Sequence, residues 1–381
     1  MISLSNLAHA RPAIAAFAAM GVLWGSFAAA LPDLKTMLGV DERELGLLIF
    51  CTPIAAISAM LLAPGFGAAV GRMALPLAAV LMALAFALPG QADVWWLFPL
   101  AMAFVGAATG LTDVLMNARV AAMETSRGLH LMNLAHAAYS FGYAGGAVIT
   151  GMLRGAGWGP GWVMGTMAAL GVACAALTLE RDGRIEGLRK PRDGTAARLG
   201  WVPVIGGGIV LIAFMTENAA ENWSALHIEK TLGGSPQEGA LGPALLALTM
   251  GFARLGGQGL AGRVNPFTLL RVGAVIASVG ALVVAEAPGP GLAYLGFFVM
   301  GIGASVLAPT AFSLVGQLSA PGARARAIAR ATLLGYFGYF VGPPLLGLIA
   351  GTFGLRAAFL YAACLVGMVF VLAPVMARQR T

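Results

Sequence analysis

Apolar runs of about twenty residues recur along this chain and constrain its fold more than any other feature. A helix needs about 20 residues to cross the hydrocarbon core of a bilayer. Charged residues are only 10% of the 381, too few to give a soluble chain of this size a charged surface. We therefore predict an all-α membrane protein with twelve transmembrane helices. The predicted helices cover residues 13–31, 45–70, 74–88, 95–116, 131–153, 162–179, 201–228, 240–261, 267–285, 292–314, 328–350 and 357–376.

The positive charges divide unevenly between the two sides that these helices define. With a cytoplasmic N-terminus, 18 of the 23 lysines and arginines fall on the cytoplasmic side. Such an excess is the orientation signal of a multi-pass membrane protein. The net charge of +7 therefore does not indicate a nucleic-acid surface, and both termini are expected in the cytoplasm. The apolar run that follows Arg11 is long for a signal peptide and is interpreted as a retained first helix.

The two halves of the chain repeat one another. The segment FGYAGGAVITGMLRG from Phe141 and the segment FGYFVGPPLLGLIAG from Phe337 share four glycines, one phenylalanine and one tyrosine at an offset of 196 residues. The longest polar stretch, residues 180–200, separates six predicted helices from the other six. We predict an N-terminal six-helix bundle over residues 1–180, a cytoplasmic linker over 181–200 and a C-terminal six-helix bundle over 201–381. Membrane proteins built from such repeats carry their ligand site near the bilayer midplane, between the halves.

Three acidic residues lie inside predicted helices, whereas the other thirteen of the sixteen lie in loops. They are Asp113, Glu217 and Glu221. An acid at the membrane centre costs about 2.5–3.5 kcal/mol on insertion scales, so it is expected to be functional, protonated or paired. These three residues are therefore the first candidates for a site.

Asp113 shares one helix face with Thr109 and Asn117, because each follows the previous one by four residues. A carboxyl group or an imidazole that faces a central cavity is able to carry a proton. For Asp113 and for His136, the alternative is a static polar clamp between helices. The next predicted helix presents a second polar face made of Asn133, His136, Ser140 and Tyr143.

Glu217 and Glu221 lie one helical turn apart, and Asn218 and Asn222 repeat that spacing to give a broad polar stripe. Glu217 is the deeper of the two acids, and a functional role is favoured for it. Glu221 lies nearer the surface beside Trp223. For that pair, an interfacial position with the tryptophan in the aromatic belt is an equal alternative to a role in substrate binding.

The remaining unusual residues receive structural interpretations. Arg254 is expected to extend its charge to the cytoplasmic edge, with an ion pair to an acid as the alternative. Each of the three cysteines lies in an apolar run without a cysteine or histidine nearby, and all are expected to be inert thiols. The sequence contains no P-loop, HExxH, CxxC or GxSxG motif. No metal, cofactor or ATP-driven step is therefore expected.

The segment GLTDVLMNARVAAMETSRGLHLMNLAHAAYSFG, residues 110–142, resembles the fucose permease-like branch of the major facilitator transporters. In the sugar symporters of that branch an acid precedes an asparagine by four residues, which corresponds here to Asp113 and Asn117. Their NLA motif with a following polar residue corresponds here to the segment that ends at His136. The stretch from Glu217 through ENWSAL is similar to uncharacterised bacterial members. The resemblance implies a major facilitator fold of two pseudo-symmetric bundles, located in a bacterial inner membrane.

Two departures from that branch bear on the substrate. The sugar symporters use an acid inside the first helix, whereas here that helix offers only Asp33 at its predicted outer end. The loop after the second helix usually carries an Asp-Arg pair, and here Gly71 precedes Arg72. The sugar substrate is thus left open.

The residues and the resemblance together predict a secondary transporter that moves a small, sugar-like or otherwise polar solute by alternating access, coupled to protons. Asp113 is expected to carry the proton, and Glu217 to be a second proton or substrate carboxylate. The expected partners are the solute, protons and the lipid bilayer, without nucleic acid, and a monomer suffices because one chain holds both halves. The candidate substrate-binding residues are Trp24, Asn117, His136, Tyr139, Tyr143, Asn218 and Glu221.

Three alternatives remain. Proton-driven export of drug-like amphipathic compounds is the main one. An integral-membrane enzyme would need a cluster of reactive groups at one membrane face, but the four histidines are spread over both faces and the interior. A receptor or scaffold would leave three buried acids as an uncompensated cost.

Overall fold

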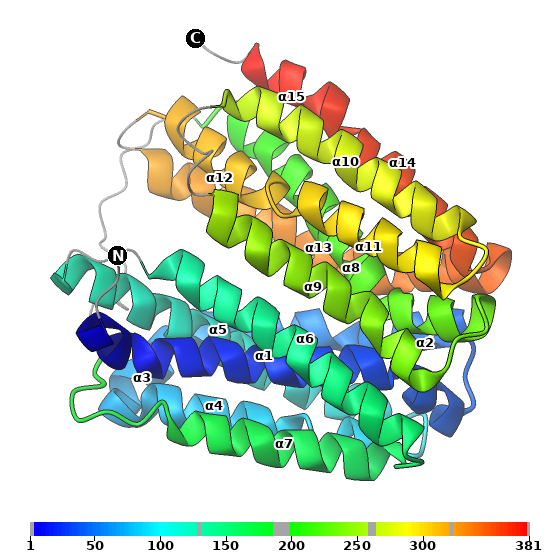
Figure 1. The fold of residues 1–381 in the computed structure, drawn as a ribbon. Coiled ribbons are helices and arrows are strands. Elements are labelled where there is room, and N and C mark those ends of the chain that lie inside the picture. Colours follow the sequence, from blue (N-terminus) through cyan, green and yellow to red (C-terminus); the bar gives the residue numbers. More distant parts are fainter. Residues whose placement is uncertain (1–3, 128–130, 186–198, 258–263, 321–322, 379–381) are drawn as a thin grey trace.

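The computed structural model describes residues 4–127, 131–185, 199–257, 264–320 and 323–378, and over these residues every regular element is a helix (Figure 1). The first helices are α1 (Leu4–Leu38), α2 (Glu42–Ile49), α3 (Cys51–Val70), α4 (Ala74–Ala85), α5 (Phe98–Arg127), α6 (Met132–Gly155) and α7 (Pro160–Ala176). The later ones are α8 (Val202–Leu226), the π-helical turn η3 (His227–Thr231), α9 (Pro236–Gly257), α10 (Pro266–Glu286), α11 (Pro290–Ala304), α12 (Leu307–Leu318), α13 (Arg324–Phe353), α14 (Leu355–Gly367) and α15 (Val369–Ala377). Two short 3-10 turns, Gly71–Met73 and Pro89–Gln91, flank α4.

Each predicted apolar segment falls on one helix or on two consecutive helices. Residues 45–70 form α2 and α3, residues 292–314 form α11 and α12, and residues 357–376 form α14 and α15. Among the described residues, nine stretches are long and apolar enough to cross a membrane, and one of them, residues 42–91, spans α2, α3 and α4. The prediction of an all-α membrane protein is confirmed. The number of twelve crossings stays a prediction.

Two helix ends differ from the predicted ones. Helix α2 begins at Glu42 rather than Leu45, because the Asp41 carboxylate accepts from the Glu44 N–H at 2.7 Å and the Glu44 carboxylate accepts from the Asp41 N–H at 2.9 Å. Helix α1 continues through Pro32 to Leu38, so Asp33 belongs to a helix and not to an outer loop.

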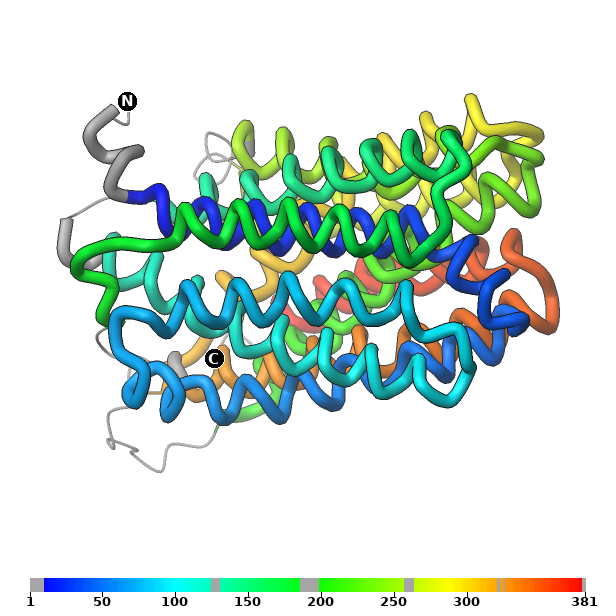
Figure 2. Tube along the Cα trace, turned by 90° about the horizontal axis from the view of Figure 1, so that it is seen from below, coloured from blue at the N-terminus to red at the C-terminus, as the bar shows by residue number. Residues whose placement is uncertain are grey.

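The helices run side by side in two groups, which we call the N-group (α1–α7) and the C-group (α8–α15) (Figures 1 and 2). In the N-group α1 packs along α6, α3 along α5, and α4 along α7. In the C-group α8 packs along α13, α9 along α11, and α10 along α14. The two sets of pairings correspond one to one along the chain. The internal repeat seen in the sequence is therefore also present in the packing.

The glycines of the repeat explain this correspondence, because each lies where a helix touches a neighbour. A Cβ atom added to Gly142 or Gly146 would meet the backbone of α1, and one added to Gly338 would meet that of α8, where Gly342 faces Asn218. The later glycines serve contacts between the groups. Gly151 and Gly155 of α6 face α9, and their repeats Gly347 and Gly351 of α13 face α2.

The groups therefore meet along two equivalent seams, α6 with α9 and α2 with α13. Helix α13 packs closely on α2 but touches α3 only slightly, so this seam loosens along α3 toward the predicted cytoplasmic side. Most of the predicted linker, residues 186–198, lies outside the described residues.

Adjacent glycines of α6 provide a test of this packing. A Cβ on Gly146 would collide with the backbone of α1 at Val22, whereas Gly145 has no neighbouring atom within 4 Å. We expect Gly146→Ala to lower the free energy of unfolding by about 1–3 kcal/mol, the usual cost of overpacking. Gly145→Ala should leave it unchanged or slightly higher, since alanine favours helix. Thermal unfolding of the detergent-purified variants measures both, and equal effects would contradict the assigned contact.

Candidate functional site

A cavity of about 330 Å³ lies between the N-group and the C-group. Its wall is formed by α1, α2, α3, α5 and α6 on one side and by α8, α9 and α13 on the other. The volume is within the range of small-molecule sites, about 300–1,000 Å³. The three acids that are predicted from the sequence to lie inside membrane helices, Asp113, Glu217 and Glu221, all line this cavity.

Asp113 is held by partners from both groups. The side-chain amide of Asn117 donates to the Asp113 carboxylate at 3.1 Å and to the Asp113 carbonyl oxygen at 2.9 Å, one turn along α5. Tyr336 of α13 approaches the same carboxylate from the C-group and interacts with it. Thr109 lines the cavity with Asp113, but Asn117 is not among the lining residues. Asn117 thus orients Asp113 from behind the wall.

Glu217 is buried and is paired within the C-group. Its carboxylate lies 3.9 Å from the Arg254 guanidinium and accepts from the Tyr339 hydroxyl at 3.5 Å. Arg254 itself lines the cavity. The expectation that Arg254 extends to the cytoplasmic edge is therefore wrong, because its position on α9 directs it toward an acid on α8.

The polar stripe of α8 keeps unused hydrogen-bond acceptors in the cavity wall. Among the described residues, none donates a hydrogen bond to the Glu221 carboxylate. The side-chain carbonyl oxygen of Asn218 is buried and also receives no hydrogen bond from the described residues. Buried acceptors without partners are costly. This wall is therefore suited to a solute that brings N–H or O–H donors.

Aromatic rings form much of the remaining wall. Trp24 of α1 packs edge-on against Phe27 and Phe86, with ring centroids 5.7 and 5.1 Å away, and so has a fixed orientation. The rings of Tyr139 and Tyr143 lie 6.0 Å apart on α6. His136 lines the cavity near its α6 neighbours and contacts Phe17 edge-on at 5.0 Å.

Helices α5 and α6 follow one another in the chain but touch only over a small area. They are linked at one end, where the Glu124 carboxylate accepts from the backbone N–H groups of Leu131 and Met132 at 2.5 and 2.9 Å. Helix α6 packs instead along α1 and α9. Asp113 and His136 still line the same cavity. Their two helices are held together mainly by α1, which packs against both.

Trp223 does not belong to an aromatic belt. Its side chain is fully buried, and it lies against α13, close to Gly347. The interpretation of Glu221 and Trp223 as an interfacial pair is therefore wrong. Two residues along a helix differ by about 200° in direction, so Glu221 faces the cavity while Trp223 packs into the core.

Two tyrosines of α13 were missed as candidates. Tyr339 is the repeat of Tyr143 at the offset of 196, and Tyr336 precedes it by one turn. Both line the cavity and each contacts one of the acids. Extending the repeat from the glycines to the polar residues would have identified Tyr339, whereas Tyr336 stands opposite Ser140 and carries no such signal.

Two repeated helical groups around a central cavity with intrahelical acids define a membrane transporter architecture. The chain belongs to the major facilitator superfamily, whose family model matches residues 13–298 and 206–380. The superfamily recognised from the sequence is confirmed. This is a family of transporters, so the enzyme alternative is set aside.

Relatives match over most of their length. An uncharacterised MFS-type transporter of Yersinia pestis is 28% identical over 90% of this chain and 89% of its own. The membrane protein MosC of Rhizobium meliloti is 26% identical over 90% of this chain and 83% of its own. These matches extend the family assignment across both groups.

Solved structures show the same fold at low sequence identity. The nucleoside transporter NupG has a TM-score of 0.76 at 14% identity, with 98% of this chain and 99% of that chain covered. A bacterial homologue of the lysosomal transporter Spinster, in an inward-facing conformation, has a TM-score of 0.75 at 16% identity, covering 98% and 97%. The fucose:proton symporter of Escherichia coli has a TM-score of 0.60 at 17% identity, covering 96% and 97%.

Substitutions of Trp223 and Trp162 test whether Trp223 is buried in the core. Trp223 is fully buried, whereas the Trp162 side chain is 76% exposed at the start of α7. We expect Trp223→Ala to lower the free energy of unfolding by about 3–5 kcal/mol through the cavity it leaves. Trp162→Ala should change it by less than about 1 kcal/mol. Thermal unfolding in detergent measures both values, and a small effect of Trp223→Ala would contradict its burial.

Proposed function

We propose that this protein is a proton-coupled secondary transporter that moves a small polar solute through the central cavity by alternating access. The observation that carries the proposal is that three intrahelical acids, from both groups, line one cavity of small-molecule size. Such residues are costly in a membrane and mark substrate or proton pathways. The sequence has no nucleotide-binding motif, so a gradient is the natural energy source.

Asp113 is proposed as the proton-carrying carboxyl group. The interaction with Tyr336 supports this role because it joins Asp113 to the opposite group. A hydrogen bond to an ionised carboxylate is roughly twice as strong as one between neutral groups. Protonation of Asp113 would thus weaken a link between the groups, which is how a proton can bias a change of conformation.

Glu217 is proposed as a second proton or substrate carboxylate. It lies on the opposite group from Asp113, and its contacts with Arg254 and Tyr339 leave it in the cavity wall. Protonation of Glu217 would release Arg254, and a bound solute is able to do the same by replacing one partner of the pair.

The solute is proposed to be sugar-like or of similar polarity. Glu221 and Asn218 line the cavity, and each has an acceptor that receives no hydrogen bond from the described residues and suits a hydroxyl or amine donor. Trp24, Tyr139 and Tyr143 offer flat surfaces for a ring. His136 adds a further polar contact, and Asn117 acts through Asp113. Structural neighbours that are named for fucose and for nucleosides support solutes of this kind.

The proposal places the chain in a bacterial inner membrane with both termini in the cytoplasm. The asymmetry of the basic residues supports this orientation, and relatives from bacteria support the location. We further propose that residues 1–180 and 201–381 move as two bundles joined by the linker 181–200, and that a monomer is sufficient.

Export of amphipathic compounds is a second candidate. The cavity wall includes four methionines besides its aromatic rings: Met20, Met60, Met116 and Met250. Methionine side chains adapt to ligands of varied shape and are common at promiscuous binding surfaces. This lining favours apolar cargo, whereas the polar stripe of α8 favours a polar solute.

A proton assay on purified protein distinguishes the two candidates. We expect deoxy and neutral sugars, added at several pH values, to produce a proton release that is absent in Asp113→Asn. Asp93→Asn is the matched control, because Asp93 is an exposed acid outside the cavity. A signal from amphipathic compounds with none from sugars would favour export.

Transport in proteoliposomes tests the role of Asp113 with whichever solute gives the proton signal. Asp113→Asn should abolish accumulation against a gradient, because the amide cannot carry a proton. Exchange of labelled for unlabelled solute should persist, since that step needs no net proton movement. Accumulation at the rate of the Asp93→Asn control would contradict the assignment.

A further inference from the structure

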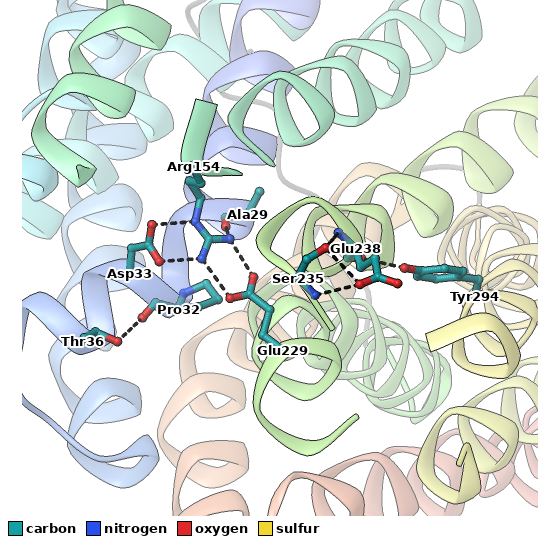
Figure 3. A network of polar contacts seen from close by, with 9 residues as sticks. All are labelled: Ala29, Pro32, Asp33, Thr36, Arg154, Glu229, Ser235, Glu238 and Tyr294. Carbon is teal, nitrogen blue, oxygen red and sulfur yellow. Dashed lines mark hydrogen bonds and ion pairs between the residues drawn. The ribbon is translucent and has the colours of Figure 1, made fainter. Parts of the chain in front are cut away.

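Arg154, in the last turn of α6, binds two carboxylates at one end of the molecule (Figure 3). It donates to Asp33 through Nε and Nη2 at 2.8 and 2.6 Å, and to Glu229 through Nη1 and Nη2 at 2.7 and 2.9 Å. The Ala29 carbonyl oxygen accepts from Nη1 at 2.6 Å. Its side chain is 1% exposed. All five N–H groups of the guanidinium are therefore used.

The two carboxylates come from different groups. Asp33 lies on α1, which packs along α6, so its ion pair with Arg154 is internal to the N-group. Glu229 lies in the π-helical turn η3 between α8 and α9, so its ion pair with Arg154 joins the C-group to the N-group. Short π-helical segments are rare and frequently occur at functional sites.

The contact continues into the α6–α9 seam. Gly151 of α6 lies against Ala240, and Gly155 lies against Gln237, both on α9. A side chain on Gly239 would collide with the Glu229 carboxylate, so the glycine makes room for that carboxylate. The ion pair between the groups thus lies at the end of a closely packed seam on the predicted outer side, above the cavity.

We propose that Arg154, Asp33 and Glu229 form a lock that keeps this end of the cavity closed. When the end opens, Glu229 leaves with the C-group, while Asp33 stays on Arg154 as its permanent partner. This inference rests on the proposed alternating access, but it concerns a set of residues apart from the substrate and proton site.

The need for two carboxylates follows from the chemistry of arginine. A guanidinium does not lose its proton in a protein, and a buried charge that loses its only partner is strongly destabilising. With Asp33 in place, opening breaks one ion pair and leaves the other intact. The Asp33 side chain is 34% exposed and that of Glu229 only 10%, so Asp33 already tolerates contact with water.

A distance measurement tests the lock without any substrate. The three cysteines are first replaced by serine, and spin labels are attached at Asp93→Cys and Glu286→Cys. Both positions are exposed, one in each group, at the end that carries the lock. Pulsed electron resonance of the full-length protein then gives the populations of short and long label distances, which report the closed and open outer end.

Glu229→Gln and Asp33→Asn both change a carboxylate to an amide, but they are expected to affect the ratio of open to closed differently. Glu229→Gln weakens only the closed state and should raise the ratio of open to closed by at least about tenfold. Asp33→Asn removes a partner from both states and the last partner from the open one, so that ratio should stay unchanged or fall. Glu238→Gln is the matched control with no expected change, because Glu238 bonds Ser235 within the C-group.

An unchanged distribution in Glu229→Gln would overturn the proposal and leave a static clamp. Equal opening by Glu229→Gln and Asp33→Asn would overturn the role of Asp33 as the permanent partner. If Asp33→Asn does not fold, the double variant Asp33→Asn with Arg154→Gln decides, because removing the cation should restore folding and an open population. Failure of that rescue would also count against the proposal. Since no solute or proton is involved, an error in the proposed solute or in the proposed proton coupling would leave these results unaffected.

Discussion

A charge inside a membrane protein needs a partner, and the arrangement of this structure depends on that requirement. The lipid-facing helix surfaces carry apolar side chains such as Leu61, Phe104 and Trp162, whereas Asp113, Glu217, Glu221 and Arg254 line the cavity and Arg154 is buried. Arg154 donates four of its five N–H groups to two acids and the fifth to the Ala29 carbonyl oxygen. Arg254 meets Glu217, whereas Glu221 lines the cavity and receives no hydrogen bond from the described residues. We therefore propose that the incompletely paired charges mark where a solute or a proton completes the pairing.

Sequence patterns predicted the parts of this structure that depend on local chemistry. Apolar runs gave the helices, and the repeat around Phe141 and Phe337 gave the equivalence of α6 and α13, because each glycine serves a helix contact that both halves make. Asp113 was identified because an acid in an apolar run is exceptional in any fold. These inferences needed no knowledge of which helices are neighbours.

Predictions failed where the answer depended on the partner helix. The Arg254 side chain points toward the cavity because Glu217 on α8 pairs with it. Trp223 is buried because α13 packs against it. Asp33 was taken for a loop acid because Pro32 suggested a helix end, but α1 continues through that proline and brings Asp33 to Arg154, which is 121 residues away. Pairings over such separations leave no trace in a single sequence.

The glycines that pack the helices recur in both halves, whereas the residues that make the charged contacts do not, and this difference bears on mechanism. Packing glycines recur at the offset of 196, so the two seams between the groups are equivalent. Two residues that contact the charges do not recur: Arg154 stands opposite Ala350, and Tyr336 stands opposite Ser140. A symmetric scaffold alone would give two states of similar energy. In the function proposed above, residues present in only one half, Arg154 at the outer end and Asp113 with Tyr336 at the centre, make the states differ in ion pairing and in affinity for a proton.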